Sequence, residues 1–283
     1  EHDYRHLVEI LLAAGIEPWA EKRAAMISAD SPLLVCGGVV TFMNPEPLAP
    51  FVDLFVVGEA EPVLSQLMRA FAVGLSGAGS RRDLLWSINR DLPGCYVPQL
   101  YPPRYDERGQ FAGYDRPAGL PPRIAKTSLS SCAVAGHSQL LTPEAEFADL
   151  YLTELGRGCS RGCRFCTAGF IYRPPRLWDV GAVIRGLEAR DASVRRIGLL
   201  GMEMADPAGL DQIADHLGLN GCALSFSSLR ADRITPPLLQ LLGTSGLKSV
   251  AIAPDGSSER LRRVINKNIS EDEAAMGMQA ILD

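Results

Sequence analysis

LYLTELGRGCSRGCRFC, residues 150–166, decides the fold of the chain. Its first six residues form an apolar run that is typical of a strand. The run leads directly into a loop that carries Cys159, Cys163 and Cys166. In parallel sheets with βα connections, the loops that follow the strands carry the chemistry. The stretch therefore predicts an α/β fold with a functional loop at the carboxyl end of a strand.

Three further apolar runs follow, separated by helical patterns, at residues 196–201, 223–229 and 248–254. Four βα units in succession predict a TIM-like, barrel-shaped parallel sheet over residues 149–283. Because four units cannot close a barrel, we expect either an open sheet or further strands beyond residue 283. Ser270 and Glu273 have the spacing of a capping box and predict the start of the last helix.

The first part of the chain predicts a second, Rossmann-like α/β domain fragment over residues 1–76. A helical pattern at residues 4–14 is followed by two apolar runs at 32–38 and 51–61, and an amphipathic helix follows the second run. Proline and glycine are frequent from residue 77 to 148, which predicts a linker of short strands and hairpins. The sequence opens inside a helical pattern without a Met, so we expect it to be part of a longer protein.

The composition of the chain bears on whether it binds nucleic acid or a membrane, and on its compartment. The 28 Lys and Arg residues against 33 Asp and Glu residues give a formal net charge of −5, which does not indicate nucleic acid binding. The sequence shows neither a basic leader nor an apolar run of the ~18–20 residues that a membrane helix needs. Three of the seven cysteines lie within eight residues, which is metal spacing and predicts a reducing, cytoplasmic compartment.

Three thiolates on one loop suit an iron–sulfur cluster. A cubane cluster has four irons, so three cysteine ligands leave one iron open to a cofactor or substrate. Arg157, Arg161 and Arg164 could offset the negative charge of the sulfurs. Zinc is the alternative metal, but it needs a fourth ligand, and the nearest candidates, Cys132 and His137, lack finger-like spacing.

The spacing Cys-x3-Cys-x2-Cys, with Phe165 before the last cysteine, resembles the signature of the radical S-adenosylmethionine (SAM) superfamily. The resemblance implies a [4Fe-4S] cluster on Cys159, Cys163 and Cys166 whose open iron binds SAM. It also implies an enzyme that cleaves SAM reductively to a 5'-deoxyadenosyl radical, which abstracts hydrogen from a substrate. A reductant such as flavodoxin or ferredoxin would supply the electron.

The resemblance extends to the ends of the second and third strands. Gly201 and Glu203 stand where the superfamily often has Gly-Gly-Glu holding the amino group of SAM, although Met202 departs from that pattern. Ser227 and Arg230 follow the third strand. Arg230 could hold the SAM carboxylate in a fork, and a salt bridge to Asp232 is an equally weighted alternative.

In the fourth unit, the segment from Ala253 to Lys267 resembles the part of such barrels that lies beside the ribose and methionine. It suggests Asp255 and Ser257 as further SAM contacts. Phe165 would belong to the same cofactor site.

Residues 33–67 resemble the second half of the cobalamin-binding-type domain that precedes many radical SAM barrels, with Asp53 before Val-Val-Gly-Glu. The Asp-x-His-x-x-Gly motif that ligates cobalt does not occur in these residues, so cobalamin has no ligand motif here. We expect either a degenerate domain or a motif that lies before residue 1. The layout resembles a group of bacterial radical SAM proteins that brings no known substrate. A cobalamin-dependent methylase and a non-enzymatic electron-transfer protein remain the alternative functions.

Overall fold

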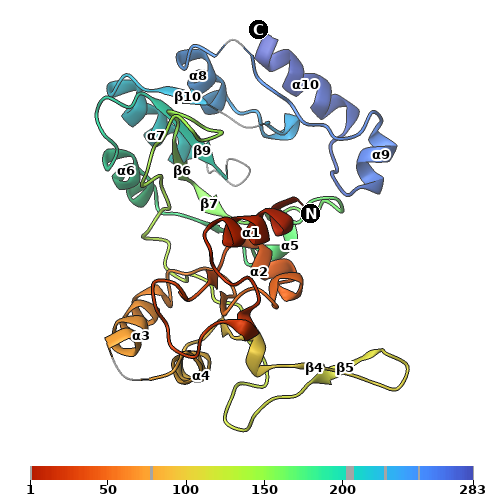
Figure 1. Ribbon diagram of the computed structural model, residues 1–283. Coiled ribbons are helices and arrows are strands. Elements are labelled where there is room, and N and C mark those ends of the chain that lie inside the picture. The colour runs from red at the N-terminus through yellow and green to blue at the C-terminus, as the bar shows by residue number, and fades with distance from the viewer. Residues whose placement is uncertain (1, 77–78, 202–206, 226–227, 248, 283) are drawn as a thin grey trace. The chain divides into compact units, whose positions relative to one another are not determined.

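The computed structural model describes residues 2–76, 79–201, 207–225, 228–247 and 249–282. The chain divides into two compact units, unit 1 (Glu1–Ser130) and unit 2 (Ser131–Asp283). Both combine helices with sheets (Figure 1), so the predicted mixed α/β architecture is confirmed.

Unit 1 is built on a three-stranded sheet of order β1-β2-β3. β1 is parallel to β2, whereas β3 is antiparallel to it. The strands of the unit are β1 (Val35–Cys36), β2 (Leu54–Val56), β3 (Cys95–Tyr96) and a separate antiparallel hairpin, β4 (Pro103–Tyr105) and β5 (Phe111–Tyr114). The helices are α1 (His2–Ala13), α2 (Val39–Met43), α3 (Leu64–Ser76) and α4 (Arg81–Asp91), with short 3-10 turns η1 (Ala20–Lys22), η2 (Glu46–Leu48) and η3 (Pro98–Leu100).

The segment expected to be a linker, residues 77–148, contributes α4 and β3 to the core of unit 1. Ser80 and Asp83 form a capping box that starts α4. The helix then buries Leu85 and Ile88 against the fully buried strand β2. The proline-rich and glycine-rich composition of the segment therefore applies to the stretches on either side of a helix, and not to the segment as a whole.

A buried ion cluster ties the start of unit 1 to its sheet. Oδ2 of Asp53 accepts hydrogen bonds from Arg23, at 2.7 Å, and from Arg81, at 3.1 Å. It also accepts one from the backbone N–H of Leu34, at 2.8 Å. The side chains of Arg23 and Asp53 are 0% exposed. The aspartate that the sequence placed in a cobalamin-type pattern therefore has a structural role.

Unit 2 contains a parallel sheet and a small antiparallel pair. Its strands are β6 (Tyr151–Glu154), β7 (Gly156–Arg157), β8 (Arg176–Leu177), β9 (Arg196–Leu200) and β10 (Ala223–Ser225). The helices are α5 (Ala168–Ile171), α6 (Val180–Glu188), α7 (Pro207–Leu219), α8 (Pro236–Thr244), α9 (Glu259–Val264) and α10 (Glu271–Leu282), with the 3-10 turn η5 (Ala231–Arg233).

The parallel sheet has the order β10-β9-β6, so the three strands expected at residues 150–155, 196–201 and 223–229 lie side by side. Helices α6, α7 and α8 pack in succession along the sheet (Figure 1). The fourth expected strand, at 248–254, is represented in the described part of the chain by one parallel bridge between Leu229 and Ile252.

The start of the last helix is confirmed. The backbone N–H of Ser270 donates to Glu273, and the N–H of Glu273 donates to the Ser270 hydroxyl. Across both units, no helix of the described residues has the length and apolar character needed to span a bilayer.

Candidate metal centre

The cysteine loop leaves the sheet at the carboxyl end of β6. Glu154 lies in register with Leu200 at the end of β9, and the N–H of Leu155 donates to the Leu200 carbonyl at 2.7 Å. Gly201, which directly follows β9, lies against Gly156. A Cβ on Gly201 would come within 2.9 Å of the Gly156 carbonyl oxygen. The end of β9 and the beginning of the cysteine loop are therefore in direct contact.

The loop itself turns tightly. Gly158 has a φ of +90°, and a Cβ there would lie 2.2 Å from the Tyr172 carbonyl oxygen, so only glycine fits. The backbone N–H of Arg161 donates to the sulfur of Cys159 at 3.4 Å. Cys163 is buried, whereas Cys159 and Cys166 are half-buried. An N–H donated to sulfur stabilises a thiolate, the form in which cysteine binds metals.

The far end of the chain holds the loop in place. The backbone N–H of Arg164 donates to the Ile265 carbonyl at 2.9 Å, and the side-chain amide of Asn266 donates to the Gly162 carbonyl at 2.7 Å. The Arg164 guanidinium also donates to the Val264 carbonyl. These contacts join residues about a hundred positions apart, and no motif within the loop predicts them.

Each arginine of the loop has a protein partner in the structure. Arg157 forms an ion pair with Glu154 at 3.0 Å, and Arg161 forms one with Asp232 at 3.3 Å. The positive charges of Arg157 and Arg161, which we expected to offset the sulfurs, are therefore also balanced by carboxylates of the protein.

Asp232 links the loop to the segment after β10. It accepts two hydrogen bonds from Arg230, at 2.8 and 3.0 Å, in addition to the Arg161 contact. Burial raises the pKa of Asp232, but the hydrogen bonds and charges of Arg230 and Arg161 outweigh burial and hold this pKa below its ordinary value. The alternative of a salt bridge between Arg230 and Asp232 is thus confirmed, and the guanidinium fork proposed for SAM is engaged with a protein carboxylate.

Lys267 brings together three of the residues that the sequence suggested for the cofactor. Its carbonyl accepts a hydrogen bond from Arg230 at 2.9 Å, and its ammonium forms an ion pair with Asp255 at 2.5 Å. The same ammonium lies 5.9 Å from the ring centre of Phe165. Lys267 is 8% exposed, so its charge is held within the unit. Sequence reasoning missed this lysine, because a lysine in the turn after a helix is ordinarily a solvated residue.

The remaining expected contacts are placed as follows. Glu203 and Ser227 lie outside the described residues. Ser257 is exposed, and the hydroxyl that caps α9 belongs to its neighbour Ser258, which accepts from the N–H of Leu261.

The donor set suits a cluster in number and kind, because three cysteines share one loop and none of them forms a disulfide. Among the described residues, however, no three His, Cys, Asp or Glu side chains converge closely enough to hold a metal ion. Ligand placement and metal binding are commonly coupled in metalloproteins, so cluster binding requires the thiols to turn toward one centre. His137, a candidate zinc ligand, instead makes a 2.7 Å hydrogen bond with the Tyr151 hydroxyl.

Two stretches of the chain match known protein families. Residues 1–98 match the family of radical SAM proteins, N-terminal, and residues 153–283 match the radical SAM superfamily. The chain is also 29% identical over 248 residues to the uncharacterized protein MJ0966 of Methanocaldococcus jannaschii. That alignment covers 86% of this chain and 47% of the relative, so the chain spans about half the length of the curated relative it matches.

The loop that carries Cys159, Cys163 and Cys166 lies within the stretch that matches the radical SAM superfamily. The chain belongs to the radical SAM superfamily. Membership indicates an enzyme and implies an iron–sulfur cluster and SAM, and it leaves the reaction unspecified.

Proposed function

We propose that Cys159, Cys163 and Cys166 hold a [4Fe-4S] cluster with which the enzyme cleaves SAM reductively. The observation that carries this proposal is the position of the three thiols, on the loop that leaves the carboxyl end of β6 beside the end of β9. When bound, the cluster supplies one electron that splits SAM into methionine and a 5'-deoxyadenosyl radical. The substrate on which the radical acts is not identified by any residue of the chain.

The described residues support specific tasks around the cofactor. Phe165 presents a ring that is 55% exposed, which suits stacking against adenine. Asp255 and Lys267 form an ion pair next to that ring, and Asp232 positions Arg161 and Arg230. Gly201, Glu203, Ser227 and Ser257 complete the proposed contacts of SAM. We expect β6, β9 and β10 to belong to a partial (β/α) barrel, with residues 1–76 as the Rossmann-like fragment before it.

The compartment and partners follow from the same chemistry. None of the seven cysteines forms a disulfide, which suits a reducing cytoplasm. A low-potential reductant such as flavodoxin or ferredoxin would deliver the electron. The family favours an enzyme over an electron-transfer carrier. A cobalamin-dependent methylase rests on the pattern of residues 33–67 alone, and Asp53 in that pattern serves the buried ion cluster.

Anaerobic reconstitution with iron and sulfide tests the proposal. We expect about four irons per chain and a cluster that dithionite reduces, whose EPR spectrum changes when SAM is added, and formation of 5'-deoxyadenosine. Cys163→Ala should lose the cluster signal, whereas Cys132→Ala, in the same unit but outside the loop, should keep it. A fully loaded, full-length protein that leaves SAM intact would contradict the proposal.

A further inference from the structure

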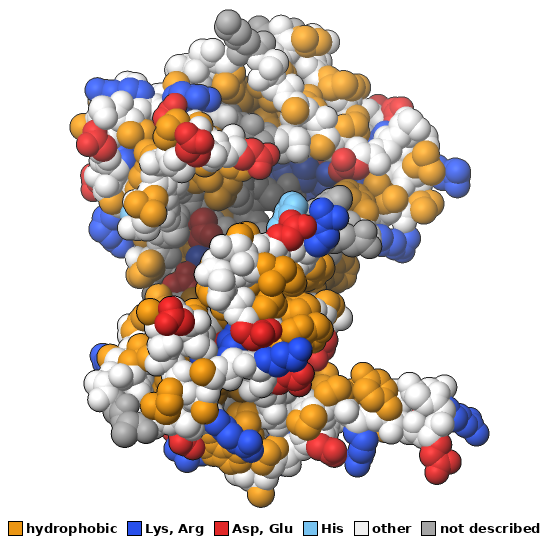
Figure 2. Space-filling model, viewed as in Figure 1, with side chains coloured by type: hydrophobic (Ala, Val, Ile, Leu, Met, Phe, Trp, Pro, Cys, Tyr) orange, Lys and Arg blue, Asp and Glu red, His pale blue; other side chains and the backbone are white. Residues whose placement is uncertain are grey.

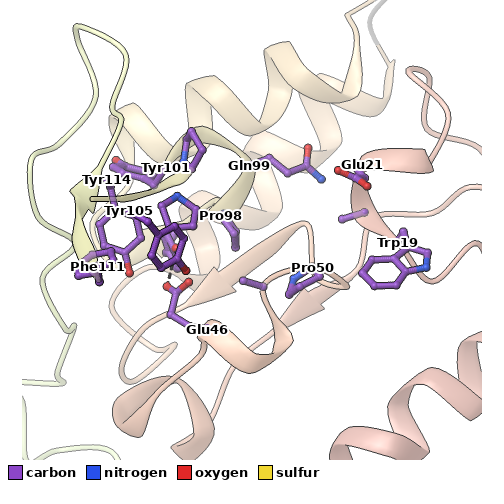
Figure 3. Close-up of a pocket in the computed structure, with 15 residues that line it drawn as sticks. Trp19, Glu21, Glu46, Pro50, Pro98, Gln99, Tyr101, Tyr105, Phe111 and Tyr114 are labelled. Carbon is purple, nitrogen blue, oxygen red and sulfur yellow. Dashed lines mark hydrogen bonds between the residues drawn. The ribbon is translucent and has the colours of Figure 1, made fainter. Parts of the chain in front are cut away.

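Unit 1 contains a hollow of about 760 Å³, which is lined by residues between Trp19 and Tyr114 and by none of the cysteine loop. Its walls come from η1, η2, η3 and the β4–β5 hairpin (Figure 3). At one end Tyr105, Phe111 and Tyr114 gather near Glu46, and at the other end lie Trp19 and Glu21. The volume is in the range of sites for small molecules, ~300–1,000 Å³.

The hollow concentrates exposed aromatic rings. Trp19 is 43% exposed, Tyr105 60%, Phe111 57% and Tyr114 42%. Phe111 is in edge contact with both tyrosines of the hairpin, with ring centres 6.3 Å from Tyr105 and 5.0 Å from Tyr114. In Figure 2, hydrophobic side chains cover the base of the projecting hairpin, and charged side chains occupy its tip. The three hairpin rings, Tyr105, Phe111 and Tyr114, thus form one aromatic surface that lines the hollow.

A carboxylate lies against these rings. Glu46 is half-buried and accepts a hydrogen bond from the Tyr96 hydroxyl at 2.7 Å. The pKa of Tyr114 is raised by burial first and then by the negative charge of Glu46 and its hydrogen bond to that carboxylate. A carboxylate has about four acceptor positions, so these two hydroxyls leave room for a further donor.

The charges of the lining are all negative. Glu21 and Glu46 belong to the lining, and the lining residues, all described by the structure, include no Lys, Arg or His. The neighbouring cations have partners of their own. Lys22 lies 5.7 Å from the Trp19 ring centre, and Arg104 lies 4.0 Å from Asp115. Arg116 donates to the Leu120 carbonyl, although its charge also acts on Tyr101.

We propose that this hollow binds a small organic cation, an ammonium group on an aromatic or alkyl body. The faces of aromatic rings attract cations, and the attraction increases when water is excluded. A carboxylate adds a charge-assisted contact and disfavours anions. The charge of Lys22, 5.7 Å from the Trp19 ring centre, disfavours a second cation at that end, so the cationic group lies at the Glu46 end, against Phe111 and Tyr114. This site belongs to unit 1 and does not depend on the proposed cluster.

The test is a titration of the 283-residue chain by calorimetry with three probes of similar size. N,N-Dimethylbenzylammonium carries the cation and an N–H donor, N,N-dimethylbenzamide is neutral, and benzenesulfonate is an anion. We expect the cation to bind about tenfold more tightly than the neutral probe, and the anion not to bind. Equal binding of the cation and the neutral probe, or no binding of the cation at millimolar concentration, would overturn the proposal.

Matched variants locate the site. Glu46→Gln should weaken binding of the cation about tenfold, a loss of one charge contact worth ~1.4 kcal/mol. Glu107→Gln, the same change in the exposed turn of the same hairpin, should leave it unchanged. Phe111→Leu should weaken binding several-fold, and Phe147→Leu, of nearly equal exposure at 58%, should not. Because Phe111 is exposed, its variant folds even where Glu46→Gln does not, and an unaffected Phe111→Leu variant counts against the site.

Discussion

Replacing Asp53 with Asn should destabilise unit 1 severely. Asp53 and Arg23 have side chains that are 0% exposed, and Arg81 is 5% exposed. Asn keeps the shape and one acceptor oxygen but removes the only charge that the structure places against both guanidinium groups among the described residues. Removing one partner of a buried ion pair costs ~3–5 kcal/mol. Whole domains are stable by only ~5–15 kcal/mol, so a loss of this size removes a large share of the stability of unit 1.

The other hydrogen bonds of Arg23 and Arg81 limit how much unfolding free energy Asp53→Asn removes. Arg23 also donates to the carbonyls of Pro18 and Phe51, at 2.8 and 2.6 Å, and Arg81 donates to the carbonyl of Pro32 at 3.0 Å. Both guanidinium groups therefore keep acceptors in the variant, and the loss is mainly one of charge. We expect a value nearer ~3 than ~5 kcal/mol for this reason.

Urea denaturation, followed by circular dichroism and tryptophan fluorescence, measures the effect. Trp86 packs against the core of unit 1 and reports its unfolding. The control is Asp115→Asn, which removes an exposed contact of 4.0 Å with Arg104 and should change stability by less than ~1 kcal/mol. If Asp53→Asn shifts the free energy of unfolding no more than Asp115→Asn does, the cluster does not stabilise the unit and the reasoning fails.

Three other changes test unit 2. Gly201→Ala should cost ~2 kcal/mol in thermal unfolding, because φ is +85° and the new Cβ meets the Gly156 carbonyl, whereas Gly218→Ala, with open space, should cost nothing. The pKa of Asp232 is lowered in the folded protein, so this carboxylate contributes fully to the free energy of unfolding above ~pH 4, and the contribution is lost as the pH falls through the lowered pKa. Unfolding measured across acid pH should show this loss, and Asp232→Asn should abolish it. Ser270→Ala should cost ~1 kcal/mol in urea, and a change near zero would mean that the cap is dispensable.

Local patterns were sufficient to predict β6, β9 and β10, the strands of the parallel sheet in unit 2. Residues 150–155 and 196–201 are short apolar runs, and the structure has β6 and β9 there. The box of Ser270 and Glu273 is likewise local. By contrast, α4 was not predicted, although Ser80 and Asp83 have cap spacing, because Asp replaces the usual Glu or Gln and the surrounding segment is rich in proline and glycine.

The candidate site was predictable only in part, because its connections are long-range. The cysteines and Phe165 lie within eight residues of one another, so their spacing alone was enough to predict them as site residues. The approach of Lys267 to Phe165 depends on how the chain returns to the loop after α9, and the pairing of Arg161 with Asp232 depends on its return after β10. A single sequence does not carry this information, because ion pairs between distant residues have no spacing rule.

The hydrogen bond from Asn266 to the Gly162 carbonyl joins residues 104 positions apart. A ribosome adds ~5–20 residues per second, so the cysteines emerge roughly 5–20 s before their anchor has been made. During that interval the three thiols stand on a nascent loop that is open to oxidation and to competing metals. Insertion of the proposed cluster into an ordered site therefore has to follow the synthesis of residue 266, and slow translation of the stretch between them would lengthen the vulnerable period.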